Sequence, residues 1–308
     1  MAGGRSNLTY GLTDGRERWV LRRPPLGHVL ATAHDMGREY TVMSALAGSE
    51  VPVPRMVTLC ADTGVLGAPF YVMSFVDGTV YRSGEQLAKL SASAAEDLAS
   101  QLVDVLVGLH SIDPIAVGLA ELGRPSGFLA RQVRRWGTQL AASRSREVPG
   151  LLELGDRLAR DLPRGEAPRL VHGDYKLDNV VVRDGIVAVL DWEMATLGDP
   201  VTDLVNLALW WEGVRDTDGI AIAAAPSDLA FFPPATRLLD RYRALTGTNL
   251  DELPWYIGLA CFKLAAIFEG MYYRQTQGLT VGEGFDRLAG LAPALARRGH
   301  DALDGAGA

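Results

Sequence analysis

The residues whose types and spacing could carry chemistry lie in two neighbouring segments. The first reads His172-Gly173-Asp174-Tyr175-Lys176-Leu177-Asp178-Asn179, and the second reads Val189-Leu190-Asp191-Trp192-Glu193. Asn179 follows Asp174 by five residues, and Asp191 follows Asn179 by twelve. Kinase-type phosphoryl transfer uses the same order: an Asp that accepts the proton of the acceptor hydroxyl, an Asn on a metal ion, and a further Asp on the bridging metal ions. The spacing therefore indicates phosphoryl transfer.

The types of these side chains suit a magnesium site. Mg²⁺ is a hard cation that prefers oxygen ligands and takes the remainder from phosphate and water, which predicts Asn179 and Asp191 as the metal ligands. The runs 180–182 and 186–190 are expected to be strands, because they are β-branched and are joined by the turn signal Arg183-Asp184-Gly185. The two ligands would then flank one hairpin. Lys176 is placed within reach of a transferring phosphate, although a solvated lysine is the alternative.

Other interpretations of the same residues are structural. Asp and Asn favour turns and caps because their side chains bond the local backbone, but the two flanking strands and the spacing favour catalysis for Asp174, Asn179 and Asp191. His172 is expected to brace the loop. No other catalytic motif competes, because the sequence has no Gly-x-x-x-x-Gly-Lys-Ser/Thr loop, no His-Glu-x-x-His helix and no Gly-x-Ser-x-Gly elbow.

Composition narrows the class of protein. The chain has 308 residues, 48% of them hydrophobic and 22% charged, which suits a soluble protein of one or two domains. Its net charge of −7 argues against nucleic acid or anionic membrane as a partner. Cys60 and Cys261 lack metal-ligand spacing and are expected to be buried free thiols in a reducing compartment. The first residues lack the apolar core of a signal peptide, and no apolar run approaches the ~20 residues of a membrane span. We therefore predict a cytoplasmic protein.

The first 77 residues predict a small sheet with one helix. Strands are expected over 8–13, 18–23, 55–60 and 69–75, with Asp14-Gly15 as the turn between the first two. Helical spacing of apolar residues runs over 34–46. Asp77-Gly78 marks the end of this strand-rich part.

The rest of the chain is expected to be mainly helical. Apolar spacing predicts helices over 93–110, 127–142, 151–162, 200–211, 227–246, 254–276 and 282–296. We therefore predict an α+β, bilobal architecture, with a β-rich domain over 1–77 and a larger helical domain over 78–308. A cleft between two such lobes is a common place for a ligand.

These motifs resemble the aminoglycoside phosphotransferase family, which has a protein-kinase-like fold. The resemblance is carried by His172-Gly173-Asp174 with Asn179, by Leu190-Asp191-Trp192-Glu193, and by Gly198-Asp199-Pro200 with Asp203-Leu204. It extends over almost the whole chain. The run from Asp191 to Pro200 resembles in particular the phosphotransferase domains that are fused to acyl-CoA dehydrogenases.

The resemblance implies ATP and Mg²⁺ as cofactors and assigns further roles. Asp174 would be the catalytic base. Asp203 would brace the catalytic loop. Glu39 would be the helix carboxylate that fixes the phosphate-binding cation. The remaining positions would form a glycine-rich loop over the phosphates and a hinge against adenine. The loop would comprise Gly3, Gly4, Ser6 and Asn7, and the hinge would comprise Ser74, Phe75 and Val76.

Two features depart from the family pattern. The strand position that usually carries Lys reads Val20-Leu21-Arg22-Arg23, and alternation along the strand would turn Arg22 into the cleft. Arg keeps the charge and can bind phosphate oxygens with its fork, but it is bulkier than Lys. The chain also starts almost at the phosphate loop, whereas relatives have a strand before it, so we expect either a misassigned start codon or a nucleotide-binding lobe that is truncated at its start.

The sequence therefore predicts an ATP- and Mg²⁺-dependent kinase that phosphorylates the hydroxyl of a small molecule. The acceptor is expected to be a hydroxyacyl-type metabolite or an aminoglycoside-like compound. The basic residues Arg131, Arg134 and Arg135 share one helix face, which is usually solvated but could also receive an anionic substrate. A degenerate, non-catalytic nucleotide-binding protein of the same fold is the alternative. The oligomeric state is left open.

Overall fold

The computed structural model describes residues 7–25, 35–143, 145–278 and 287–305. Its N-terminal part is a four-stranded antiparallel sheet in the order β1-β2-β4-β3, formed by β1 (Leu8–Thr13), β2 (Arg18–Arg23), β4 (Phe70–Ser74) and β3 (Met56–Cys60). In the β1–β2 hairpin Leu8 pairs with Arg23. The chain turns at Gly15, whose φ of 90° is costly for residues with a Cβ. Four expected strands are thus confirmed.

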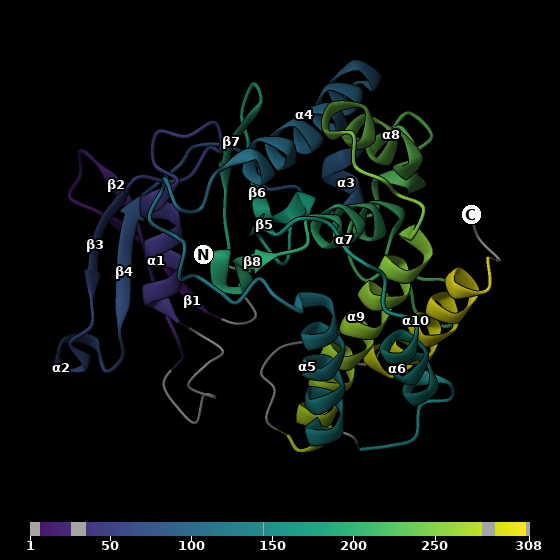
Figure 1. The fold of residues 1–308 in the computed structure, drawn as a ribbon. Coiled ribbons are helices and arrows are strands. Elements are labelled where there is room, and N and C mark those ends of the chain that lie inside the picture. Colours follow the sequence, from purple (N-terminus) through teal and green to yellow (C-terminus); the bar gives the residue numbers. More distant parts are fainter. Residues whose placement is uncertain (1–6, 26–34, 144, 279–286, 306–308) are drawn as a thin grey trace.

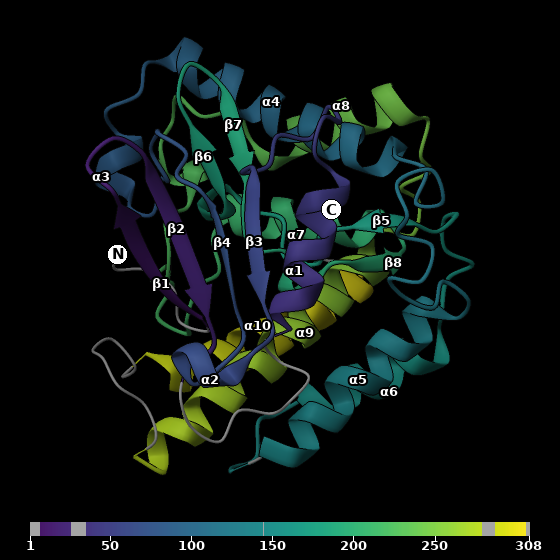
Figure 2. The same cartoon turned by 90° about the vertical axis from the view of Figure 1, so that its left-hand side faces the viewer.

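One helix, α1 (Met36–Ala45), lies between this sheet and the rest of the molecule (Figure 1). Asp35 caps it, because its side chain accepts a hydrogen bond from the backbone N–H of Arg38. Met36 and Met43 are buried in the same core as Tyr71 of β4. Figure 2 shows α1 running alongside β3 and β4. The helix therefore ties the sheet to the larger part of the fold.

The larger part is helical, as expected. Its long helices are α4 (Ala92–Ser111), α5 (Phe128–Ser143), α6 (Leu151–Arg160), α7 (Val201–Glu212), α8 (Ala235–Thr246), α9 (Leu253–Thr276) and α10 (Leu288–Leu303). Helix α9 packs against α5, α6, α7 and α10 (Figure 1). By length and composition α9 could cross a membrane, but 72% of its most apolar window is buried inside the fold, as in the core helix of a globular domain.

Short elements complete the helical part and position the functional segment. The strands β6 (Val180–Val182) and β7 (Ile186–Val189) form the expected hairpin. β5 (Arg169–Val171) pairs with β8 (Thr196–Gly198), a strand that the sequence pattern does not predict. The single-turn elements are α2 (Thr63–Leu66), α3 (Gly84–Leu87), η1 (Leu177–Asn179), η2 (Trp192–Met194) and η3 (Pro226–Asp228).

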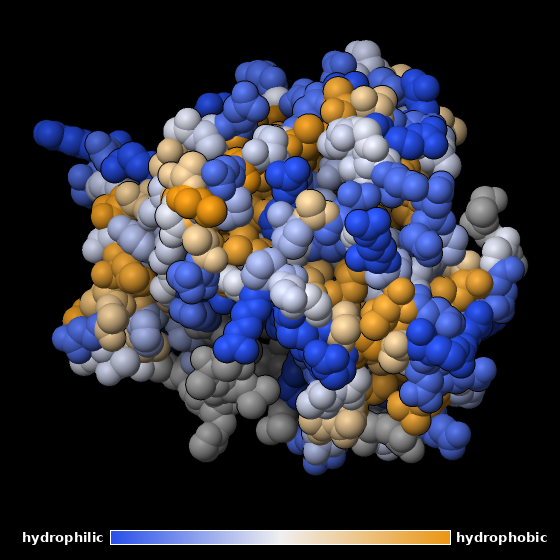
Figure 3. Space-filling view, in the orientation of Figure 1, coloured by the Kyte–Doolittle hydropathy of each residue, from blue (hydrophilic) through white to orange (hydrophobic). Residues whose placement is uncertain are grey.

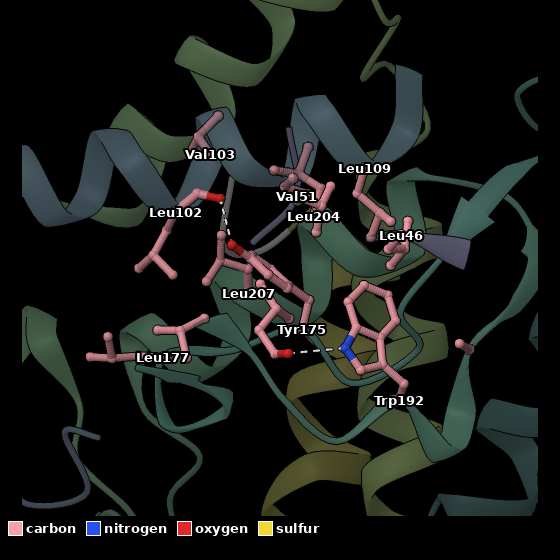
Figure 4. Close-up of a cluster of buried hydrophobic side chains, with 14 of the residues drawn as sticks. Leu46, Val51, Leu102, Val103, Leu109, Tyr175, Leu177, Trp192, Leu204 and Leu207 are labelled. Atoms are coloured by element: carbon pink, nitrogen blue, oxygen red, sulfur yellow. Dashed lines mark hydrogen bonds between the residues drawn. The ribbon is translucent and has the colours of Figure 1, made fainter. Parts of the chain in front are cut away.

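The functional segment is anchored in the core at both ends. The buried Tyr175 donates its hydroxyl to the carbonyl of Leu102 on α4 at 2.9 Å, and the Trp192 indole N–H donates to the carbonyl of Val189 at 3.0 Å (Figure 4). Both rings are completely buried, in the cluster that also contains Tyr71. Because their polar atoms are satisfied, neither ring carries a desolvation penalty.

Three expectations about local structure are wrong in detail. The helix predicted over 227–246 begins only at Ala235, because Pro233 and Pro234 precede it and the residue before a proline disfavours helix. The last helix is α10 at Leu288–Leu303 rather than 282–296, and residues 282–286 lie outside the described residues. Cys60 is only half-buried, whereas Cys261 is buried and both are free.

Candidate active site

The hairpin β6–β7 brings the two predicted metal ligands together. Val180 pairs with Val189, and the N–H of Leu190 donates to the carbonyl of Asn179 at 2.8 Å. Asp191 follows directly, with left-handed φ and ψ of 68° and 59°. Such a conformation costs a non-glycine residue of order 1–3 kcal/mol and persists only where the surroundings over-determine it. Strain of this kind is typical of residues whose direction matters for function.

The predicted catalytic base, Asp174, lies against a cation and an amide. Its Oδ2 lies 2.8 Å from Lys176 Nζ and accepts a hydrogen bond from Asn179 Nδ2 at 3.2 Å. Burial raises the pKa of Asp174, but the charges of Lys176 and Lys263 outweigh burial, and the pKa is held below its usual range. The carboxylate is therefore ionised at neutral pH, the form that can accept a hydroxyl proton.

Lys263 is a functional candidate that sequence reasoning missed. It lies on α9 and donates from Nζ to the carbonyl of Gly173 at 2.6 Å, one residue before Asp174. Burial lowers the pKa of Lys263, while the charge of Asp174 opposes this shift. A signal was present, because Lys263 is the first charged residue in an otherwise apolar helical segment that begins at Leu253.

The predicted catalytic loop is braced from α7, as expected for Asp203. Its buried carboxylate accepts the backbone N–H of His172 at 2.6 Å and that of Gly173 at 2.8 Å. His110 lies 3.5 Å from the same carboxylate and 2.7 Å from the hydroxyl of Tyr242. His172 also acts as a brace, since its Nε2 lies 2.9 Å from the carbonyl of Leu190. Both histidines thus hold backbone and neighbouring side chains in place.

Asp203→Asn is expected to destabilise the fold by roughly 2–3 kcal/mol, because one carboxylate oxygen that accepts a backbone N–H would become an NH₂ group facing that donor. Urea unfolding measures the loss. The matched control is Asp240→Asn on α8, an exposed Asp whose loss should change stability by less than about 0.5 kcal/mol. Equal midpoints for the two variants would contradict the bracing role.

Arg22 joins the sheet, α1 and the hairpin. Its Nη1 donates to Glu39 Oε2 at 2.8 Å, and its Nη2 donates to Asp191 Oδ1 at 2.9 Å. The hydroxyl of Tyr71 donates to the same Glu39 oxygen at 2.9 Å. The expected pairing of Arg22 with Glu39 is therefore confirmed. Because Arg22 and Glu39 are both buried, their charges are held in a region of low dielectric.

A third carboxylate, Glu193, completes an acidic cluster with Glu39 and Asp191 that the sequence did not reveal. Carboxylate oxygens of Glu39, Asp191 and Glu193 lie within 4.8 Å of one another. Asn7 is buried and donates from Nδ2 to both Glu39 and Glu193, at 3.2 Å in each case. Burial and the charges of Asp191 and Glu39 raise the pKa of Glu193 to about 8. The site therefore holds more acid than Arg22 alone neutralises.

This raised pKa predicts a pH-dependent stability. The folded protein keeps a proton on Glu193 to about pH 8, whereas the unfolded chain loses it near 4.5. The stabilisation is thus complete below pH 4.5 and is lost as pH rises through 8. Urea unfolding without divalent ions should show wild type losing stability over this range relative to Glu193→Gln. Parallel pH profiles for the two proteins would contradict the assignment.

The donor set around the hairpin fits a magnesium ion. Asn179 directs its Nδ2 to the carbonyl of Asp174 at 2.9 Å and to the carboxylate of that residue, which leaves its amide oxygen available to a metal ion. Asp191 offers one oxygen beyond the one that Arg22 contacts. Hard oxygen donors of this kind suit Mg²⁺, whose remaining positions are filled by phosphate and water.

The predicted nucleotide contacts are only partly visible. Gly3, Gly4 and Ser6 lie outside the described residues. The side chain of Asn7 contacts the carboxylates of Glu39 and Glu193 rather than lining an open phosphate-binding loop. At the predicted hinge the N–H of Ser74 donates to the carbonyl of Arg55, and the N–H of Phe75 donates to the carbonyl of Arg18. Adenine contacts at this edge would therefore come from Val76 or from the carbonyls.

Comparison with known proteins extends these observations. A model of the phosphotransferase enzyme family, APH, matches residues 1–245. Acyl-CoA dehydrogenase family member 11 of Rattus norvegicus is 34% identical over 302 residues, which are 96% of this chain and 39% of that protein. The chain thus spans about two fifths of the length of such curated relatives.

Solved structures agree with the family match. A putative aminoglycoside phosphotransferase of Ralstonia eutropha is 30% identical with a TM-score of 0.83, covering 98% of this chain and 91% of its own. The ternary complex of aminoglycoside phosphotransferase APH(4)-Ia with AMP-PNP and hygromycin B is 16% identical with a TM-score of 0.65, covering 100% and 93%, and this likeness concerns the fold alone. The chain therefore belongs to the APH phosphotransferase family and has its kinase-like fold.

Proposed function

We propose that this protein transfers the γ-phosphoryl group of ATP to the hydroxyl of a small molecule, with Mg²⁺ as cofactor. The observation that carries the proposal is the contact of Asp174 with Asn179, beside the hairpin that places Asp191 against Arg22 and its partner Glu39. Binding of AMP-PNP by APH(4)-Ia, a protein of the same fold, supports a nucleoside triphosphate as donor.

The chemistry follows from positions and charges. The bond between the γ-phosphorus and its bridging oxygen breaks, a bond forms between that phosphorus and the acceptor oxygen, and the hydroxyl proton passes to Asp174. ADP leaves with the bridging oxygen. Asn179 and Asp191 would hold Mg²⁺, which supplies charge compensation for phosphate oxygens when bound. The protein contributes mainly fixed orientation and fixed charge.

Two cations of the chain would meet the phosphates. Arg22 is held by Glu39 through Nη1, so its Nη2, which contacts Asp191 in this structure, would meet the triphosphate at little further cost in side-chain entropy. Lys176 lies 4.5 Å from the centroid of the Trp210 ring while it pairs with Asp174. This places its ammonium beside the base, where the transferring phosphoryl group acquires charge in the transition state.

The acceptor we favour is a hydroxyacyl-type metabolite. Curated relatives that cover almost the whole chain are named acyl-CoA dehydrogenase family members, so a substrate of acyl metabolism suits this branch of the family. An aminoglycoside-like compound is the competing acceptor, supported by the 28% identity to hygromycin-B 4-O-kinase of Escherichia coli over 135 residues.

One observation favours a second candidate, a nucleotide-binding protein without catalysis. Arg22 occupies one oxygen of Asp191, and Lys176 occupies one oxygen of Asp174. If these pairs persisted with nucleotide bound, the base and the metal ligand would both remain neutralised by cations of the chain. Transfer would then be blocked although nucleotide binding remained.

Product analysis separates the two candidates. The protein is incubated with Mg-ATP and, separately, with aminoglycosides, amino alcohols, hydroxy acids and their coenzyme A esters, and phosphorylated products are sought by mass. We expect one acceptor class to gain a phosphate with stoichiometric formation of ADP. Thermal stabilisation by Mg-ATP without a phosphorylated product from any class, and without slow hydrolysis, would establish the non-catalytic candidate instead.

A further inference from the structure

A pocket beside the catalytic loop is lined by α5, α9, the start of α7 and the segment after Asp191. Its walls include Gly173 of the loop, and Lys263 projects from α9 to the carbonyl of this residue. Asp174 is not itself a lining residue, but the charges of Lys263 and Asp174 act on each other, so a molecule beside Lys263 would lie close to the proposed base. We take it as the acceptor pocket.

The described charged residues that line the acceptor pocket are all cationic. Lys263 and Arg135 are among its lining residues, and none of the described residues that line it is an Asp or a Glu. Burial of Arg135 and the positive charge of Arg38 on α1 both lower the pKa of Arg135, so three cationic groups share this region. Figure 3 shows hydrophilic side chains gathered where the N-terminal region approaches α5.

An aromatic wall lies between the cations. The guanidinium of Arg135 lies 5.0 Å, and the ammonium of Lys263 5.9 Å, from the centroid of the buried Trp136 ring. These distances allow cation–π attraction, which helps to hold both charged groups at the pocket. Phe128 and Tyr256 add further aromatic surface. The residues that line the pocket therefore combine two cations with apolar walls.

We propose that the acceptor pocket recognises an anionic group on an otherwise apolar hydroxylated substrate, with Lys263 and Arg135 as the specificity-determining residues. This inference rests on the proposed function and names its substrate class. An anion beside Lys263 would lie close to the reacting hydroxyl, because Lys263 contacts the residue next to Asp174. A polycationic aminoglycoside would meet two like charges and no carboxylate among the described lining residues, which disfavours its binding.

The test compares acceptors that differ only in charge. Hydroxy acids of graded chain length, from hydroxybutyrate to hydroxydodecanoate, are compared with their neutral methyl esters, their coenzyme A esters and hygromycin B. We expect the free acids to have kcat/KM at least tenfold above both the methyl esters and the coenzyme A esters, because the thioester of the latter is neutral at the position of the carboxylate. Equal use of methyl esters, or preference for hygromycin B, would overturn the proposal.

Variants locate the effect within the pocket. Lys263→Met and Arg135→Gln keep much of the side-chain length and remove the charge, so each should reduce the ratio of anionic to neutral kcat/KM by about tenfold. Arg134→Gln is the matched control, because Arg134 adjoins Arg135 on α5 but does not line the pocket, and its ratio should be unchanged. An unchanged ratio in both pocket variants would contradict the assignment.

A binding measurement separates this inference from the proposed function. Titration calorimetry of hydroxydecanoate into wild type and Lys263→Met needs no turnover, and we expect clearly weaker binding by the variant. If no acceptor is phosphorylated but this difference is seen, the proposed function fails and the anion site stands. If phosphorylation is seen but wild type and variant bind hydroxydecanoate equally, the anion site fails alone.

Discussion

Replacing Asp174 by Asn is expected to lower kcat by roughly a thousandfold, within the range typical of a lost general base. The amide cannot accept the hydroxyl proton, whereas the carboxylate is held ionised by Lys176 and Lys263 against the opposing effect of burial. The substitution keeps the shape of the side chain and one oxygen for Asn179. Folding and the Kd for Mg-ATP should therefore change little, and the loss should appear in kcat.

The comparison needs a variant with the same chemical change elsewhere. Asp184→Asn lies at the exposed turn of the β6–β7 hairpin, where φ is 55° and Asn is well tolerated. It should retain wild-type turnover and the same unfolding midpoint. Product formation, nucleotide affinity and thermal unfolding are measured on all three proteins. If Asp174→Asn kept wild-type turnover, Asp174 would not be the base and the assignment of the loop would be wrong.

Local pattern was sufficient to predict the elements that carry the site. The Asp14-Gly15 turn and the alternation along β2 predicted a hairpin that turns Arg22 into the cleft, and the valine runs around Gly185 predicted the second hairpin. These features depend on residues that are close in sequence, so their physics is local. The resemblance to the family then supplied the pairing of Arg22 with Glu39, which no local pattern contains.

Long-range contacts explain what the sequence did not predict. Lys263 reaches Gly173 across 90 positions, and Asn7 reaches Glu193 across 186. No periodicity or spacing in the sequence indicates either contact, because the packing of α9 and of the first strand brings these residues together. The strand β8 was missed for the same reason, since its three residues become a strand only by pairing with β5. Context of this kind routinely overrides local propensity.

Arg22→Met should destabilise the protein by about 3–5 kcal/mol, the usual consequence of removing one partner of a buried ion pair. Glu39 would remain fully buried with only Tyr71 and Asn7 as partners. Arg22→Lys should lose less, because one ammonium keeps the charge but cannot replace the fork that contacts Glu39 and Asp191 together. Mg-ATP affinity should fall in the same order. The control in the same strand is Arg23→Met, because Arg23 donates to the backbone carbonyl of Leu66.

The pH dependence of this loss distinguishes an unpaired charge from simple loss of packing. Burial already raises the pKa of Glu39 to about 7 despite the opposing charge of Arg22, and without Arg22 it would rise further. In Arg22→Met, Glu39 therefore takes up a proton, and the difference from wild type should shrink as pH falls. Adding Glu39→Gln to Arg22→Met removes the charge outright and should recover much of the stability at pH 8. A loss that was independent of pH and unaffected by Glu39→Gln would mean that Arg22 acts through packing.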